Sequence, residues 1–381
     1  MNTTKIKDVC VVVSGTTPKS TEKRYWNGTH VWITPAELTE DSFIVSDSER
    51  HITDEAVKAT GLKPFPKGTV LLSSRAPIGK VAIAGCDMYC NQGFKNLICS
   101  DSIYNLYLYY FLKSKTEYLN SLGRGATFKE ISKGIVEDIT IPFPAYDEQI
   151  HIAKQLQKIT ELIALKKRQY RYLDDIIRSR FLERFGDPII NPFDYPIHEL
   201  GDYIENLTSG SRGWARYYAD DGNAWFITIK NVKNCKITVD NMQTINAPDN
   251  AEAKRTRVKE GDLLISITAD LGRTGIVTKE IANKGSYINQ HLSCIRLNRH
   301  ALEPLYVAYF MESEAGKRQF KKENQSAVKA GINFKSIQSL KLMVPPLVRQ
   351  EEFLSFYKQV DKSKYCGAIS LHLLEDVSHM L

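Results

Sequence analysis

The sequence predicts an α+β fold in which two homologous globular domains are each followed by a long helix. Two observations support this prediction. Apolar residues recur every seventh position in the middle of the chain, and the same pattern returns near its end. Other motifs recur in the same order in both halves, which indicates an internal repeat. At 381 residues the chain is long enough for two domains, each with its own core.

The central long helix is predicted within residues 149–185. Two interleaved apolar series alternate by four and three residues, and only Lys166 interrupts the seam that they form. A heptad pattern over more than three repeats is typical of a helix that packs on another long helix. At 1.5 Å per residue this helix would be roughly 50 Å long. Its seam residues are Ile152, Leu156, Ile159, Ile163, Tyr170, Leu173 and Ile177.

A second long helix is predicted at residues 348–381. Gln350 lies 201 residues after Gln149, and at the same offset Gly367 matches the seam breaker Lys166. For one apolar heptad, ordinary core packing is the simpler interpretation. Two copies at a fixed offset favour a pair of spacer helices instead. The seam residues of the second helix are Phe353, Tyr357, Val360, Leu371 and Leu374.

The globular halves contain short β-rich runs entered through glycine turns, helical segments with apolar and aromatic spacing, and a last strand closed by proline. We expect one domain at residues 1–145 and another at 186–347, with the long helices at 146–185 and 348–381. The matched motifs are 68–73 with 261–266, Asn91-Gln92 with Asn289-Gln290, the helical segments 103–118 with 303–320, and the strands ending at Pro142 and Pro345.

Composition places the chain among ordinary globular proteins, with 43% hydrophobic and 25% charged residues. No apolar run is long enough for a transmembrane helix, and the N-terminal segment lacks a signal-peptide pattern. The seven cysteines are odd in number and scattered, so a reducing cytoplasm fits best. The net charge of +7 permits contact with a polyanion through local patches but does not by itself indicate it.

No motif of catalysis is complete. The segment 191–195 is similar to the loop of amino-methyltransferases but lacks its second proline, and no glycine-rich cofactor loop precedes it. The segment 248–254 has the letters of a nuclease metal site in a loop too short to surround an ion. We therefore expect no catalytic residues and no metal site. A DNA methyltransferase or nuclease with a diverged active site remains the alternative.

Basic and aromatic residues gather in loops at matching positions of the two halves of the repeat. Arg and Lys contact phosphates or guanine edges, and Trp and Tyr pack on sugars or bases. A solvated surface is the simpler interpretation for any one residue, but two differing copies of such a loop favour DNA contact. The candidates are Thr17, Lys19, Arg24, Tyr25, Trp26, Arg75, Lys80, Arg124 and Lys129 in the first half, and Arg212, Trp214, Arg216, Tyr217, Arg273 and Lys329 in the second.

The chain resembles the specificity (S) subunits of type I restriction–modification systems along essentially its whole length. The second copy departs from the first in having Arg349 in place of Glu148, and Thr268 in place of Arg75. The motifs that carry the resemblance in the first half are 14–18, Tyr25-Trp26, Trp32-Ile33, 68–73 with Arg75 and Gly79, Asn91-Gln92, and 142–144 closed by Glu148-Gln149. Those in the second half are 261–264, Gly272, Asn289-Gln290, and Pro345-Pro346 closed by Gln350.

This resemblance implies two target-recognition domains that each read one half of a bipartite, asymmetric site in double-stranded DNA. It also implies that the long helices form an antiparallel coiled coil with pseudo-twofold symmetry, which sets the gap between the half-sites. An S subunit has no catalysis of its own and docks two methyltransferase (M) subunits, with restriction (R) subunits able to join. S-adenosylmethionine, ATP and Mg are then expected only in those partners. Leu165 and Phe181, among charges on the central helix, are our candidate docking surface.

Overall fold

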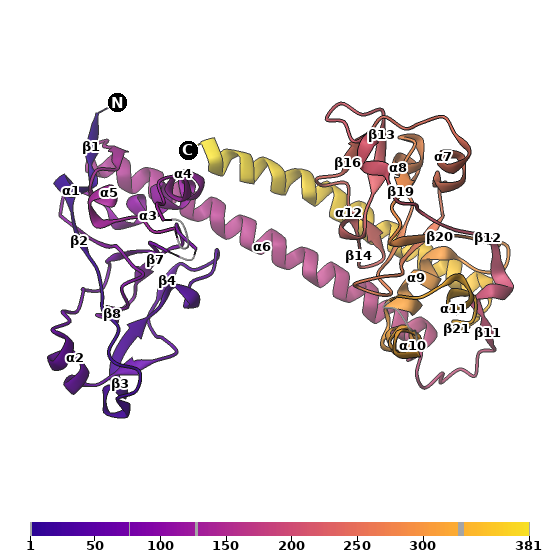
Figure 1. Ribbon diagram of the computed structural model, residues 1–381, viewed down its shortest axis with the longest axis horizontal. Coiled ribbons are helices and arrows are strands. Elements are labelled where there is room, and N and C mark those ends of the chain that lie inside the picture. Colours follow the sequence, from indigo (N-terminus) through magenta and orange to yellow (C-terminus); the bar gives the residue numbers. More distant parts are fainter. Residues whose placement is uncertain (1, 76, 126–128, 327–330, 381) are drawn as a thin grey trace. The chain divides into compact units, whose positions relative to one another are not determined.

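The chain forms two compact units in a computed structural model, and Figure 1 shows that each combines strands and helices. Unit 1 comprises Met1–Lys166 with Ile369–Leu381, and unit 2 comprises Lys167–Ala368. The structure describes residues 2–75, 77–125, 129–326 and 331–380, with the backbone alone at 325–326, 365–373 and 375–380. The border between the units falls inside the central helix, so the four domain ranges expected from the sequence remain predictions.

The main sheet of unit 1 has five strands in the order β2-β9-β6-β7-β4. Its two central strands β6 and β7 bury every side chain, which is what continuous runs of Val, Leu and Ile favour in a strand covered on both faces. The strands are β2 (Cys10–Val13), β4 (Ile44–Val45), β6 (Val70–Leu72), β7 (Val81–Ala84) and β9 (Asn96–Cys99).

A smaller sheet of unit 1 lies next to the first candidate DNA loop. Strand β3 (Trp26–Ile33) pairs antiparallel with β5 (His51–Ile52) and parallel with β8 (Tyr89–Cys90). Helix α2 (Asp54–Thr60) follows β5, begins where the Thr53 side chain accepts from the Ala56 amide, and ends at Gly61 with φ 66°. The remaining elements are β1 (Thr3–Lys5), α1 (Ile6–Val9), α3 (Asn105–Ser114), α4 (Thr116–Ser121), α5 (Lys133–Glu137) and β10 (Thr140–Pro142).

Unit 2 repeats this plan with a four-stranded sheet in the order β12-β20-β17-β18 and a three-stranded sheet in the order β16-β13-β19. As in unit 1, the middle strand of the smaller sheet has one antiparallel and one parallel neighbour. The strands are β11 (Ile197–Glu199), β12 (Ile204–Ser209), β13 (Ala224–Ile227), β14 (Val232–Lys233), β15 (Lys236–Ile237), β16 (Gln243–Ile245), β17 (Leu263–Ser266), β18 (Thr274–Ile276), β19 (Tyr287–Ile288), β20 (Leu292–Leu297) and β21 (Lys341–Met343). The helices are α7 (Ala251–Thr256), α8 (Lys279–Asn283), α9 (Pro304–Glu312), α10 (Glu314–Ser326) and α11 (Phe334–Gln338).

Both aromatic helices expected from the sequence are present, but each is split in two. In unit 1 the break falls at Lys115, where the Thr116 hydroxyl donates to the Lys113 carbonyl at 3.0 Å. In unit 2 it falls at Ser313, whose hydroxyl donates to the Phe310 carbonyl at 2.6 Å. Hydroxyl side chains that bond to nearby backbone compete with helical hydrogen bonds, so the break recurs at the same place.

The predicted long helices are α6 (Tyr146–Phe185) and α12 (Leu347–Met380). A fully buried glutamine fixes the first turn of each helix to its globular unit. The Gln149 side chain accepts from the Tyr104 amide at 2.8 Å and donates to the Pro144 carbonyl at 3.0 Å. Gln350 makes the same pair of bonds with the Glu303 amide at 2.9 Å and the Pro345 carbonyl at 2.7 Å.

The heptad seam is buried or half-buried at every position whose side chain is described; the Leu371 side chain lies outside that set. Within unit 2 the two helices run antiparallel, because Lys364 pairs with Asp174 while Glu352 pairs with Arg184. These observations confirm the predicted α+β fold with two long helices. The fold is a repeat whose two halves use the same architecture.

The sequence expectation for Phe181 was wrong. Its side chain is only 3% exposed, because α6 packs on α9 as well as on α12. The Phe181 ring stacks on Tyr306 with centroids 5.7 Å apart and meets Phe353 edge-on at 5.6 Å. Leu165, by contrast, is 58% exposed.

Candidate nucleic-acid interface

The first candidate loop of unit 1 leaves η1 (Lys23–Tyr25) and the residues before it at the surface, with Thr17, Lys19 and Arg24 exposed. The Thr17 hydroxyl donates to Oε1 of Gln92 at 2.6 Å, which ties the loop to the turn after β8. Arg24 lies 5.3 Å from the ring centroid of half-buried Tyr25 and pairs with Glu22 at 3.4 Å. This loop therefore offers an exposed guanidinium and an ammonium beside a hydroxyl and an aromatic ring.

Both candidate tryptophans are buried. Trp26 is 9% exposed and donates from Nε1 to the Lys19 carbonyl at 3.2 Å. Trp214 is 3% exposed, stacks on Phe226 with centroids 5.3 Å apart, and donates from Nε1 to Glu252 at 3.3 Å. In this conformation the two indoles hold their loops in place, and contact of either with DNA stays a prediction.

Arg50 is an exposed cation of this face that sequence reasoning did not single out. Its guanidinium carbon lies 3.3 Å from the Trp26 ring centroid and 5.7 Å from that of Trp32. Stacking on an aromatic ring restricts the orientation of an arginine while leaving its donors free. The pairing of β3 with β5 brings Arg50 beside the loop, so only knowledge of that pairing could have found it.

The matching loop of unit 2 carries the same types of residue in a different arrangement. Arg212 and Arg216 are exposed, and the Arg216 guanidinium carbon lies 4.9 Å from the ring centroid of half-buried Tyr217. Arg255, which sequence reasoning also missed, donates from α7 to the Thr208 hydroxyl and to the Ser209 carbonyl, the latter at 2.8 Å. The guanidinium of Arg255 is thus engaged in intramolecular hydrogen bonds, which fix the end of β12.

The second group of candidates, Arg75 and Lys80 in the turn after β6 and Arg273 in the turn after β17, differs most between the units. In unit 1 Arg75 and the buried Lys95 share the Glu130 carboxylate, at 3.9 Å and 3.2 Å. In unit 2 the Thr268 hydroxyl and Nδ1 of His291 are 2.6 Å apart.

The other two cations of this group are partly engaged within the protein. The Lys80 ammonium donates to the carbonyls of Pro35, at 3.4 Å, and Leu38. Arg273 pairs with Asp270. DNA contact by either would require some of these bonds to be shared.

In the third candidate loop, Arg124 and Lys129 are exposed, and Arg124 forms a backbone bridge with Glu130. Lys329 lies outside the described residues.

The Asn-Gln dipeptide that marks the repeat forms one turn in both units. The Asn91 side chain accepts from the Gly93 amide at 2.9 Å, and Asn289 accepts from the His291 amide at 3.1 Å. Asn side chains that bond backbone two residues on stabilise such turns. The neighbouring Gln92 is exposed beside Thr17, so the turn presents a side-chain amide to the candidate loop.

A hydrogen bond joins His30 of the smaller sheet of unit 1 to Asp54 at the start of α2. Nε2 of His30 lies 2.8 Å from Asp54, and this hydrogen bond lowers the pKa of the Asp54 carboxyl below its ordinary value of 3.8. In the described part of the chain, no group of three or more His, Cys, Asp or Glu side chains is arranged to hold a metal ion. No helix among these residues has the length and apolarity needed to cross a membrane.

The sequence matches the family described as type I restriction modification DNA specificity domain, over residues 1–173 and 196–365. The chain belongs to this family. It is 39% identical over 247 residues to the MjaIX specificity subunit of Methanocaldococcus jannaschii. The aligned region covers 60% of this chain and 57% of that protein. It is 28% identical over 189 residues to the EcoprrI specificity subunit of Escherichia coli, covering 44% and 47%. The chain thus spans about half the length of these curated relatives.

Two solved structures share the fold. One is the S subunit of a type I restriction–modification system from M. genitalium, with a TM-score of 0.57, 15% identity, and coverage of 100% of this chain and 94% of that chain. The other comes from work on complex assembly and conformational transition of the type I R-M system, with a TM-score of 0.58, 18% identity, and coverage of 100% and 95%. At these identities the likeness establishes the fold alone.

Proposed function

We propose that this chain is the DNA sequence-recognition subunit of a type I restriction–modification complex. The observation that carries the proposal is that two units of one architecture present different side chains at the same stations. Arg24 and Arg50 belong to one such station, and Arg212 and Arg216 to the other. Two readers with different side chains recognise two different half-sites, because base edges are distinguished by the donors and acceptors that meet them.

Catalysis belongs to partner chains in this proposal. Two M subunits supply adenine methylation with S-adenosylmethionine, R subunits supply ATP- and Mg-dependent cleavage, and the complex acts on double-stranded DNA in the cytoplasm. A methyltransferase or nuclease reading of this chain has no support from the family match, whose description is a DNA specificity domain.

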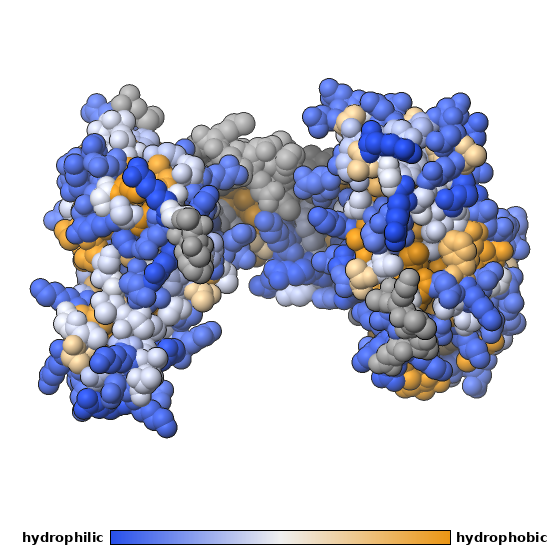
Figure 2. All heavy atoms as spheres, viewed as in Figure 1, coloured by the Kyte–Doolittle hydropathy of each residue, from blue (hydrophilic) through white to orange (hydrophobic). Residues whose placement is uncertain are grey.

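The outer face of α6 is the proposed docking surface for an M subunit. Within unit 2 this face exposes Tyr172 at 55% and Ile176 at 48%, with the Arg168 guanidinium carbon 5.5 Å from the Tyr172 ring centroid. Apolar side chains left exposed on a long helix are typical of a helix that packs on a partner. Figure 2 shows apolar residues among the mostly hydrophilic surface of both units.

The spacer function is proposed for α6 and α12 together. Inserting residues into both helices at the level of Lys166 and Gly367 should change the gap tolerated between the half-sites. An unchanged gap would contradict the proposed spacer function of α6 and α12. It would leave unchanged the proposal that each unit recognises one half-site.

The experiment that tests the whole function is selection of DNA sequences by the chain mixed with its cognate methyltransferase subunit, with the chain alone as control. We expect a bipartite site with a fixed gap, methylated on adenine only in the mixture. Methylation or cleavage by the chain alone would replace this proposal with the enzyme reading.

A further inference from the structure

Each unit has a cavity at the same place in its fold. The strand-end cavity of unit 1, bounded by residues 12–16, 60–65 and 133, has a volume of about 430 Å³. That of unit 2, bounded by Ser209, Ile267 and residues 332–335, has a volume of about 490 Å³. Both lie where the first strand of the main sheet ends and the short helix α5 or α11 begins. The pair is therefore a feature of the repeat.

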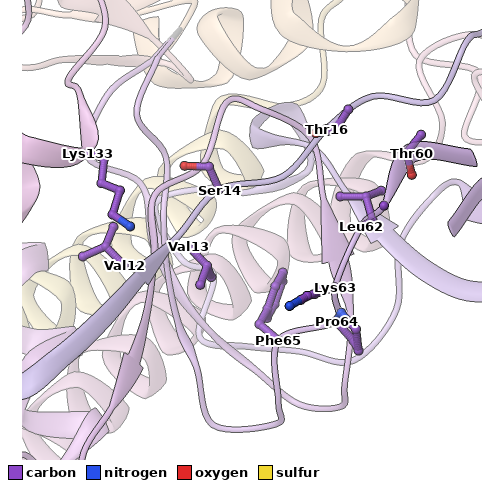
Figure 3. A pocket seen from close by; sticks show the side chains of 11 residues that line it. Val12, Val13, Ser14, Thr16, Thr60, Leu62, Lys63, Pro64, Phe65 and Lys133 are labelled. Carbon is purple, nitrogen blue, oxygen red and sulfur yellow. The ribbon is translucent and has the colours of Figure 1, made fainter. Parts of the chain in front are cut away.

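The two cavities differ in chemistry. In unit 1, Lys133 lies on one side of the cavity near Ser14, and Lys63 lies on the other side, toward Thr16 and Thr60, as Figure 3 shows; no carboxylate is among the lining residues. In unit 2 the position of Lys133, the first residue of the helix, is taken by Phe334, beside Ile267 and Ile332. Two lysines line the unit 1 cavity, whereas the unit 2 cavity has one, Lys335, beside apolar side chains, so the unit 1 cavity is the better suited to an anion.

The basic side chains near the two cavities also differ in their hydrogen-bond and ion-pair partners within the protein. In unit 2, Arg255 is already bonded to Thr208 and Ser209 at the strand end, and Lys335 is the one cation among the residues that line the cavity. In unit 1 the Lys63 ammonium has no hydrogen-bond or ion-pair partner among the described residues, and Lys133 has only Glu137, at 3.6 Å on the surface. An exposed pair at that distance is weak and does not compete with a phosphate held by two cations.

We propose that the strand-end cavity of unit 1 binds one phosphate of the DNA backbone beside the half-site that unit 1 reads, an inference that rests on the function proposed above. The cavity lies between two candidate DNA loops, because Ser14 and Thr16 belong to the loop before β3 and Lys133 follows the loop of Arg124 and Lys129. Ammonium and hydroxyl groups are among the side-chain donors that bind DNA phosphates, and such contacts set the register of a protein on the duplex without reading sequence.

The test uses the full chain with its cognate methyltransferase subunit and the selected duplex. The variant is K63Q/K133Q, and the matched control is K58Q/K67Q, which removes two exposed lysines of unit 1 outside the cavity. We expect the magnitude of the slope of log K against log salt to fall by about 1 in the cavity variant, because one phosphate contact is lost, with sequence preference unchanged. The control should keep the wild-type slope.

Neutral methylphosphonate groups, placed singly along the duplex, locate the contact. We expect one or two adjacent positions beside the unit 1 half-site to weaken the wild type and the control but not K63Q/K133Q. A scan with no such position would overturn the inference, as would a wild-type salt slope in the cavity variant.

Two other outcomes also overturn it. Loss of methyltransferase binding with unchanged DNA binding would assign the cavity to an acidic segment of that partner. Saturation of the cavity by inorganic phosphate without any effect on DNA affinity would assign it to a free anion. In each of these cases a selective bipartite site would still support the proposed function, whereas absence of any selected site in the wild type would remove the function itself.

Discussion

Units 1 and 2 are built alike where backbone and core decide the fold, and differ where side chains face outward. Gly79 and Gly272 both have positive φ, 93° and 78°, at the turn after the central strand of the main sheet. The buried glutamines at the starts of α6 and α12 make the same bonds in both units. The candidate DNA stations instead carry Arg75 with Glu130 in unit 1 and Thr268 with His291 in unit 2. The comparison indicates that the architecture is shared while the surface chemistry of each unit is free to vary.

One core difference offers the sharpest test. In unit 2 the carboxylate of Asp262, 1% exposed, pairs with both Nε and Nη2 of Arg296, at 2.9 Å and 2.7 Å. The register of the central strands places Thr69 and Ile98 at the matching positions of unit 1. Unit 1 thus manages without an ion pair that unit 2 contains.

We expect Arg296→Met to destabilise unit 2 by about 3–5 kcal/mol, because it leaves a buried carboxylate without its partner. The double variant D262T/R296I, which imports the unit 1 residues, should recover most of that loss. Urea unfolding of the full chain, followed by hydrogen exchange in unit 2, measures both. A double variant as unstable as the single one would show that the two cores are not interchangeable here.

The buried glutamines should behave alike in the two units. Gln149→Leu and Gln350→Leu should each cost about 2–3 kcal/mol, since each leaves a buried amide and a buried carbonyl unpaired. The exposed Gln169→Leu on α6 is the matched control, expected to change stability by less than about 0.5 kcal/mol. A large loss of stability in one unit only would show that the same hydrogen bonds contribute differently to the stability of the two units.

Exposed arginines should separate the two readers. Arg212→Ala with Arg216→Ala should relax selectivity at one half-site, and Arg24→Ala with Arg50→Ala at the other. The expected penalty is about 1–3 kcal/mol for each guanine whose edge is no longer bonded by an arginine. Binding of a library of variant sites to the assembled complex measures this. Equal weakening at every sequence would show that these side chains bind phosphates instead.

The smallest expected effect concerns Asp138, whose place in unit 2 is taken by Ser339. Hydrogen bonds from Lys5 and then Lys7 lower the pKa of the exposed Asp138 carboxyl below its usual 3.8. A lowered pKa stabilises the folded state above pH 3.8, and this contribution is lost as pH falls through the lowered value. NMR titration should find the midpoint below 3.8 and find it raised in K5Q/K7Q. An unmoved midpoint would mean that neither lysine holds the carboxylate.

The repeat and its helices could be predicted because heptads, glycine turns and Asn-Gln dipeptides are local in sequence. Arg50 and Arg255 could not be found, since each joins its station through pairing between distant segments. Phe181 was misjudged because the heptad describes only the α12 side of α6, whereas α9 buries a second side. The burial of Trp26 and Trp214 could not be predicted either, because an aromatic residue at the end of a loop gives no sign in sequence of which way its ring turns.

The way α6 divides its apolar residues has a consequence for synthesis on the ribosome. The core of unit 1 has its share of α6 once Leu156 has emerged, but Ile177 and Phe185 pack with Phe353, about 170 residues later. At translation rates of roughly 5–20 residues per second, these side chains stay without that partner for about 10–30 s. The nascent chain therefore carries an unfinished apolar helix for most of the second half of its translation, and is a natural client for a chaperone during that interval.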